Sequence, residues 1–206
     1  MVANVSQLLK GQKVVPVVVI ENEDQAIGLA QALLDGGINV IEITLRNSYG
    51  LEAIEVIKKR FPEMVVLAGT VNTEALLVAT VRAGVDGVIS PGITEALLDT
   101  AKRQGIPYLP GVSTASDVML AIEHGLTECK LFPATVVGGI GALKAFSGPF
   151  GDIKFCPTGG VSQDNYKDFL AQSNVMCVAG SWVAPKNLVR EGRWAEITEI
   201  CRQSLA

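Results

Sequence analysis

The sequence contains a single histidine, His124, and this scarcity excludes several kinds of chemistry. A multi-histidine metal site cannot be built, and a histidine-based catalytic triad has almost nothing to draw on. The four cysteines, Cys129, Cys156, Cys177 and Cys201, form no CxxC pair, which argues against a structural zinc site. Any catalysis therefore rests on lysine, arginine, carboxylates, hydroxyls or backbone amides.

The chain also lacks a basic block and a long hydrophobic run. It has 17 Lys and Arg residues against 21 Asp and Glu residues, a formal net charge of −4, so we expect no nucleic-acid or anionic-membrane partner. The apolar run Val14–Ile20 is too short to span a membrane and contains Pro16. The first residues show no signal-peptide core, and we expect a cytoplasmic protein with reduced, buried cysteines.

The sequence is rich in apolar residues, and they recur in short runs at regular intervals along the chain. Hydrophobic residues make up 49% of the 206 residues and charged residues only 18%, with no linker or composition shift, so we expect one domain over residues 1–206. Short β-branched runs alternate with helical patterns, which indicates βα units and a parallel sheet. The expected strands are Val14–Ile20, Asn39–Thr44, Met64–Ala68, Gly87–Ser90, Tyr108–Pro110, Cys129–Phe132, Ile153–Cys156 and Val175–Gly180.

Helical patterns fill the intervals between these runs, and one precedes the first run. The expected helices are Val2–Lys10, Asp24–Leu34, Leu51–Arg60, Thr73–Ala83, Glu95–Gln104, Ser116–His124, Gly141–Phe146, Asn165–Ala171 and Trp194–Ser204. Helix starts are expected at Asn72 or Thr73 before Glu74 and at Thr94 before Glu95, and left-handed caps at Gly36, Gly84, Gly105 and Gly125. Eight βα units predict a (β/α)₈ barrel with an extra N-terminal helix, and fewer true units would give an open doubly wound sheet.

Two charged residues fall inside apolar strands. Glu42 shares one face of its strand with Val40 and Thr44, and a buried carboxylate is unfavourable unless it is paired or functional. Lys130 shares a face with Phe132; if that face is the barrel interior, desolvation favours the neutral amine that a Schiff-base nucleophile needs. The alternatives are a structural ion pair for Glu42 and an outward-facing position for Lys130.

Glycine-rich segments follow the last two expected strands. Thr158, Gly159 and Gly160 follow one strand, and Gly180 and Ser181 end the next. In many barrels the loops at these two places bind phosphate, because glycine lets backbone amides approach an anion closely. The alternative is a pair of ordinary glycine turns. His124 is expected to end a helix before Gly125, and Trp182 and Trp194 are expected to pack in the core.

Taken together, these segments resemble one family over nearly the whole chain, from about Val14 to Trp182. The matching segments are Val15–Val17, Glu42–Arg46, Ala68–Val71, Ile89–Gly92, Pro110–Thr114, Lys130–Ala134 and Phe155–Val161. They are similar to those of the KDPG/KHG aldolases, class I enzymes that act on 2-keto-3-deoxy-6-phosphogluconate and 4-hydroxy-2-oxoglutarate.

The resemblance implies a role for each matching residue. Lys130 would form the imine and Glu42 would act as general acid and base. The pyruvyl end of the substrate would be held by Arg46, Thr70, Pro91, Phe132 and Thr158, and the phosphate by Gly159, Gly160, Gly180 and Ser181. The family uses no metal or other cofactor and is usually a homotrimer acting on a small-molecule substrate, which sets the same expectations here.

The sequence departs from the family pattern at Leu67, at Cys129 and Leu131 beside the lysine, and at Thr135, where many phosphogluconate-type members carry an acidic residue. These differences leave open which aldehyde the enzyme prefers. Two other functions remain as alternatives. A phosphate-sugar isomerase would share the phosphate loops without a nucleophilic lysine, and a non-catalytic binding barrel would keep only the ligand site.

Overall fold

A computed structural model describes residues 4–205 of the chain. Nine labelled strands alternate with ten helices in these residues, and all strand pairs are parallel. The strands are β1 (Val14–Val18), β2 (Val40–Thr44), β3 (Val65–Gly69), β4 (Gly87–Ile89), β5 (Tyr108–Leu109), β6 (Gly111–Val112), β7 (Glu128–Leu131), β8 (Lys154–Pro157) and β9 (Val178–Gly180).

The strands close into a barrel of eight staves. β5 and β6 are two halves of one stave, separated at Pro110, because β5 pairs with β4 while β6 pairs with β7. One sheet runs β5-β4-β3-β2-β1-β9 and the other β6-β7-β8. Bridges between Phe155 and Val175 and between Thr158 and Ala179 join β8 to the β9 side. The expected (β/α)₈ barrel is confirmed, and the open sheet is wrong.

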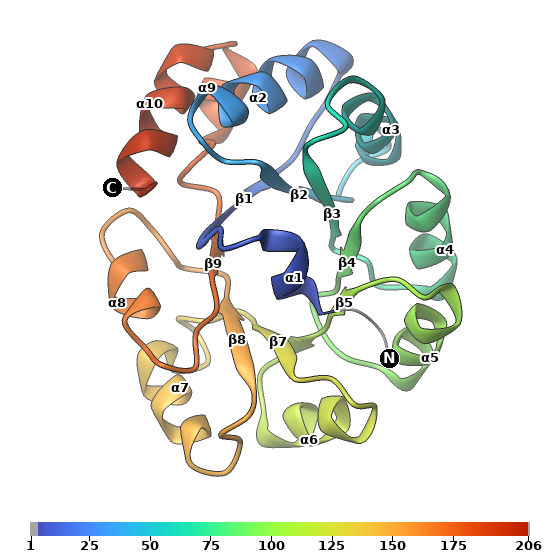
Figure 1. Cartoon of the computed structure of the whole chain (residues 1–206), viewed down its shortest axis with the longest axis vertical. Helices are drawn as coiled ribbons and strands as arrows, with labels where there is room; N and C mark the ends of the chain where they lie inside the picture. The colour runs from blue at the N-terminus through green and yellow to red at the C-terminus, as the bar shows by residue number, and fades with distance from the viewer. Residues whose placement is uncertain (1–3, 206) are drawn as a thin grey trace.

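The described residues form ten helices, and all of them except the first form a ring outside the strands, as Figure 1 shows in a view down the barrel. The helices are α1 (Val5–Leu9), α2 (Glu23–Asp35), α3 (Gly50–Arg60), α4 (Glu74–Arg82), α5 (Glu95–Gln104), α6 (Ala115–Glu123), α7 (Gly139–Ser147), α8 (Tyr166–Leu170), α9 (Lys186–Arg190) and α10 (Trp194–Leu205). None of the helices within residues 4–205 has the length and apolar character needed to cross a bilayer.

The short helix α1 is the extra N-terminal helix, and it lies across the centre of the barrel in Figure 1. Its residues Val5 and Leu9 are buried. The backbone amide of Ser6 donates a 3.0 Å hydrogen bond to Glu128, the first residue of β7. α1 therefore covers the end of the barrel where the strands begin. The expected range Val2–Lys10 began in residues that lie outside the described part of the chain.

Helix ends mostly follow the sequence signals, with one correction. Thr73 and Thr94 cap α4 and α5 by accepting hydrogen bonds from Leu76 and Leu97 amides. Left-handed glycines follow α4, α5 and α6 as expected, at Gly84, Gly105 and Gly125. The same expectation is wrong for Gly36, whose φ is −85°, and Gly37 takes the left-handed position with a φ of 87°. Gly36 lacks a side chain for another reason: its Cβ would overlap Cys201.

The core has two layers, one inside the barrel and one between strands and helices. Phe155 on β8 is fully buried and stacks on Phe146 of α7, with ring centroids 5.8 Å apart. Trp194 lies over Gly28 of α2, and Trp182 stacks on Tyr166 with centroids 5.6 Å apart. Both tryptophans therefore pack as expected. All four cysteines are buried and unpaired within the described residues.

Candidate active site

Lys130 and Glu42, which are 88 residues apart in the sequence, meet in the barrel interior. Lys130 lies on β7 and Glu42 on β2, and Lys130 Nζ lies 3.0 Å from Glu42 Oε1. Lys130 is 5% exposed and Glu42 is fully buried. Lys130 therefore faces the interior, and its outward-facing alternative is wrong. The strand alternation gave two possible faces for this lysine, and the position of the carboxylate identifies the inner one.

Glu42 has one oxygen engaged and one available. Oε1 accepts from Lys130, while Oε2 is buried and has no hydrogen-bond partner among residues 4–205. A buried carboxylate oxygen without a partner in the protein is unfavourable unless a bound ligand or water donates a hydrogen bond to it. The arrangement suits a carboxylate that exchanges a proton with a group bound beside it.

Gly69 of β3 makes room for this carboxylate. A Cβ at Gly69 would overlap Glu42 Oε1 and would lie only 2.8 Å from its Cγ and 2.9 Å from its Cδ. In the pairing of β2 with β3, Gly69 lies opposite Thr44, which is two residues beyond Glu42. Gly69 lies in the segment Ala68–Val71, in which only Thr70 had an expected role. A glycine at the end of an otherwise larger-side-chain apolar strand was the available signal.

Arg46 and Thr70 lie next to each other at the ends of β2 and β3. Arg46 Nε donates to Thr70 Oγ1 at 3.4 Å. Thr70 has a φ of 63°, a left-handed conformation that a β-branched residue rarely adopts. Such strain costs about 1–3 kcal/mol and concentrates at functional sites. Its presence here marks the loop after β3 as part of the site.

The other residues expected at the pyruvyl end differ in how close they lie to Lys130. Lys130 Nζ lies 5.3 Å from the centroid of the Phe132 ring, so Phe132 is beside the amine. Thr158 is buried, and its hydroxyl donates to the Cys156 carbonyl at 3.4 Å. Pro91 is exposed, and its backbone lies so close to Gly111 that a Cβ there would overlap it. The structure therefore shows Phe132 in contact with Lys130 and Pro91 in contact with Gly111.

The glycine segments after β8 and β9 lie against each other. Gly159 and Gly160 have φ values of 92° and 79°, and their amides donate no hydrogen bond to another atom in the described part of the chain. A Cβ at Gly180 would lie 3.3 Å from the Val161 carbonyl oxygen and would overlap the Trp182 ring. Successive free amides in left-handed glycines form a concavity suited to an anion. The exposed Ser181 follows directly.

His124 ends a helix before Gly125 as expected, away from these residues. It is the C-cap of α6, and its Nδ1 lies 4.0 Å from Asp99 Oδ1. Sequence reasoning missed α9, whose first residue Lys186 follows β9 by only a few positions. It also missed Glu21, which follows β1 in the same way. Their position just beyond strand ends was the signal that could have drawn attention to them.

Comparison with known proteins assigns the chain to a family. The family described as KDPG and KHG aldolase matches residues 5–200. A 2-dehydro-3-deoxy-phosphogluconate aldolase of Dickeya dadantii is 46% identical, over 97% of this chain and 94% of the relative. The KHG/KDPG aldolase of Escherichia coli K12 is 44% identical, over 93% and 90% of the two chains.

Solved structures agree with these sequence relatives. The KDPG aldolase of Legionella pneumophila, captured with pyruvate as a covalent carbinolamine, has a TM-score of 0.95 and 40% identity, covering 97% of both chains. The enzyme of Zymomonas mobilis ZM4 with 3-phosphoglycerate has a TM-score of 0.94 and 38% identity, covering 100% of this chain and 97% of the other. The chain belongs to the KDPG and KHG aldolase family.

Proposed function

We propose that the chain is a class I aldolase whose imine forms on Lys130. It cleaves 2-keto-3-deoxy-6-phosphogluconate to pyruvate and glyceraldehyde 3-phosphate, or 4-hydroxy-2-oxoglutarate to pyruvate and glyoxylate, or both. The observation that carries the proposal is the buried contact of 3.0 Å between Lys130 Nζ and Glu42 Oε1 inside the barrel. The carbinolamine captured in the Legionella relative supports it, because a carbinolamine is the intermediate that loses water to become an imine.

The buried pair supplies the nucleophile. Transfer of a proton from Lys130 Nζ to Glu42 Oε1 converts two buried charges into a neutral amine and a neutral acid. The pair keeps its net charge of zero, so the transfer is compatible with the apolar interior. The amine then attacks the C2 carbonyl of the substrate to give a carbinolamine. Glu42, now the acid, gives its proton to the leaving hydroxyl, so that water departs, a protonated imine forms and Glu42 is a carboxylate again.

Glu42 carries out the later proton transfers. As carboxylate, it removes the proton of the C4 hydroxyl, directly or through a water at Oε2. The C3–C4 bond breaks, the aldehyde leaves, and the bonding electrons move into an enamine on Lys130. Glu42 returns a proton to the C3 carbon, and water hydrolyses the imine to free pyruvate. Each proton transfer by a positioned carboxylate contributes about 10²–10⁴-fold.

The remaining residues position the two ends of the substrate. Arg46 presents a planar guanidinium to the pyruvyl carboxylate, and Thr70 holds that guanidinium. Phe132, Pro91 and Thr158 bound the pocket around the imine. The phosphate, where the substrate has one, binds the amides of Gly159, Gly160 and Gly180 together with Ser181. The imine itself is the electron sink, so the proposed mechanism calls for no metal or organic cofactor.

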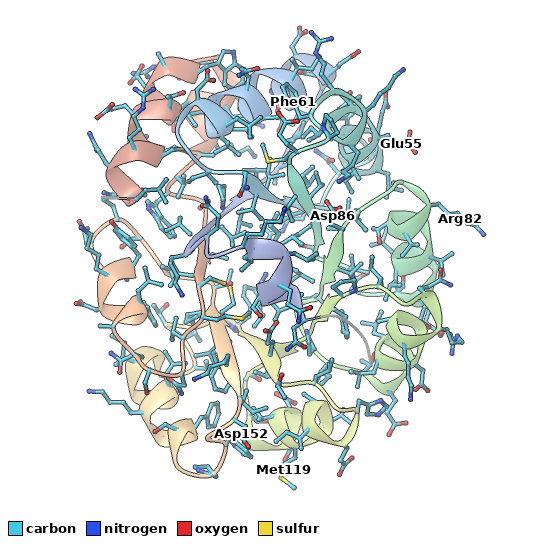
Figure 2. All side chains as sticks on the ribbon, viewed as in Figure 1. Glu55, Phe61, Arg82, Asp86, Met119 and Asp152 are labelled. Atoms are coloured by element: carbon cyan, nitrogen blue, oxygen red, sulfur yellow. The ribbon has the colours of Figure 1, made fainter. Side chains whose placement is uncertain are left out.

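We further propose a cytoplasmic homotrimer. Three of the large apolar side chains exposed within residues 4–205 lie on α6 and after β7: Met119 at 54%, Ile122 at 45% and Val136 at 80%. Figure 2 shows Met119 projecting away from the barrel on the outer edge of the molecule. Such side chains are suited to contacts between subunits. Light scattering after size-exclusion chromatography tests the trimer, and a monomeric mass would contradict it.

Borohydride reduction in the presence of pyruvate, followed by peptide mass mapping, tests the function. We expect a pyruvyl adduct on the peptide that contains Lys130 and none on the other lysines. Lys154, on the neighbouring strand β8, serves as an internal control because it is exposed. A folded protein that takes up no pyruvate would refute the aldolase and favour a phosphate-sugar isomerase.

A further inference from the structure

A cavity of about 710 Å³ opens at the end of the barrel where β1, β2 and β9 finish. Its lining includes Arg46 after β2 and Ser181 after β9. It therefore connects a residue proposed for the pyruvyl end with one proposed for the phosphate. Its outer lining carries two charges that the mechanism does not use, those of Glu21 and Lys186.

Glu21 already has a close cationic partner. Arg190 Nη2 lies 2.6 Å from Glu21 Oε1, and Arg190 Nε lies 3.1 Å from Oε2, so the guanidinium binds both oxygens. The hydrogen bond from Arg190 lowers the pKa of Glu21, which therefore stays ionised. Arg190 is not part of the cavity lining.

Lys186 is held much more loosely. Its Nζ lies 4.0 Å from Glu21 Oε1, beyond hydrogen-bond distance, and its side chain is 61% exposed. The Lys186 ammonium donates no hydrogen bond to any other residue in the described range 4–205. The ammonium group is thus available to a ligand in the cavity, while the carboxylate beside it is occupied by Arg190.

We propose that Lys186 is a specificity-determining residue that binds the phosphate of the aldehyde half, and that Glu21 opposes it. The proposal rests on the proposed function above. A phosphate bound beside Ser181 lies in the same cavity as the Lys186 ammonium, which attracts it, and as the Glu21 carboxylate, which repels it. The two residues together set how strongly a phosphorylated aldehyde is preferred over an unphosphorylated one.

A purely structural role for Lys186 predicts a different pattern. If Lys186 served only to pair with Glu21, removal of either partner would break the same surface pair and have the same small effect. Under our proposal the two substitutions act in opposite directions, because one removes the attracting charge and the other removes the repelling charge. The sign of the Glu21 effect therefore separates the two roles.

The experiment measures aldol addition of pyruvate to D-glyceraldehyde 3-phosphate and to D-glyceraldehyde. The variants are Lys186→Ala, Glu21→Gln and a matched control, Lys144→Ala, at an exposed lysine of α7 outside the cavity. We expect Lys186→Ala to lower the ratio of kcat/KM for the phosphorylated over the unphosphorylated aldehyde about tenfold, the worth of one charge-assisted contact. Glu21→Gln should raise that ratio about twofold to threefold, and Lys144→Ala should leave it at the wild-type value.

Thermal unfolding and the yield of the pyruvate adduct on Lys130 check that each variant is folded and forms the imine. A Lys186→Ala ratio equal to that of wild type would overturn the proposal, and so would a Glu21→Gln ratio that falls. In both cases wild-type aldol addition would leave the aldolase function intact. Absence of addition and of adduct in the wild-type protein would overturn the proposed function, and this inference with it.

Discussion

Glu42 and Glu128 are both buried carboxylates of barrel strands, and they have different partners. Glu42 is fully buried on β2 and lies 3.0 Å from the ammonium of Lys130. Glu128 is 6% exposed at the start of β7, on the same strand face as Lys130, and accepts the Ser6 amide of α1 at 3.0 Å. Among residues 4–205, Glu42 hydrogen-bonds to a titratable side chain, whereas Glu128 hydrogen-bonds to a backbone amide.

Under the proposed mechanism, burial of a charge does not by itself indicate catalysis. In this fold the chemistry occurs at the carboxyl ends of the strands, and residues at the other end serve stability. Glu42 meets the requirements for a catalytic group: a titratable neighbour and an oxygen, Oε2, without a partner among the described residues. Glu128 instead fixes the short helix that covers the barrel. The following predictions test that division.

The largest effect is expected for Lys130→Met. Loss of the nucleophile should reduce aldol cleavage by roughly 10⁴-fold or more and abolish borohydride trapping of pyruvate. It also leaves Glu42 buried without its cation, which costs about 3–5 kcal/mol. The double variant Lys130→Met/Glu42→Gln should recover much of that stability while remaining inactive. Appreciable cleavage by either folded variant would rule out Lys130 as the nucleophile.

Glu42→Gln should separate proton transfer from imine formation. The amide cannot accept and return a proton, so we expect exchange of the pyruvate methyl protons with deuterated water to slow by about 10²–10⁴-fold. Trapping of the imine by borohydride should fall much less. NMR follows the exchange and mass spectrometry follows the adduct. An equal loss of both would place Glu42 in a structural role and remove its contrast with Glu128.

Gly69→Ala should displace the Glu42 carboxylate without changing any catalytic residue. We expect methyl proton exchange to slow by about tenfold or more, because a misplaced carboxylate loses its alignment with the reacting carbon. Gly87→Ala on the adjacent strand β4 is the matched control. A Cβ at Gly87 would lie 2.9 Å from Leu67 Cδ2 and 3.2 Å from Leu8 Cδ1, so it would crowd two leucine side chains and leave Glu42 in place.

The two glycine variants differ in what they should change. Gly87→Ala should lower the melting temperature while the ratio of proton exchange to imine trapping stays at the wild-type value. Gly69→Ala should lower that ratio. If both glycine variants changed the ratio equally, Gly69 would have no specific relation to Glu42.

The sequence predicted the barrel well because each βα unit carries its own local signals. Apolar periodicity, threonine caps at Thr73 and Thr94, and glycine stops are encoded within a few residues. What it could not predict depends on contacts between distant segments. Strand alternation left the face of Lys130 undecided, since Glu42 lies 88 residues away. The role of Gly36 likewise depends on Cys201 of α10, and that of Glu128 on the amide of Ser6.

The smallest effect is expected for Glu128→Gln. Glutamine can still accept the Ser6 amide through its carbonyl oxygen, so only the charge of the hydrogen bond is lost. We expect unfolding in urea to show a decrease of about 1 kcal/mol in the free energy of unfolding, the difference between a charged and a neutral acceptor. Glu63→Gln, at an exposed glutamate before β3, is the control and should have no measurable effect. Aldol cleavage by Glu128→Gln should match that of wild type. A loss comparable to that of Glu42→Gln would show that both buried carboxylates take part in the proton transfers.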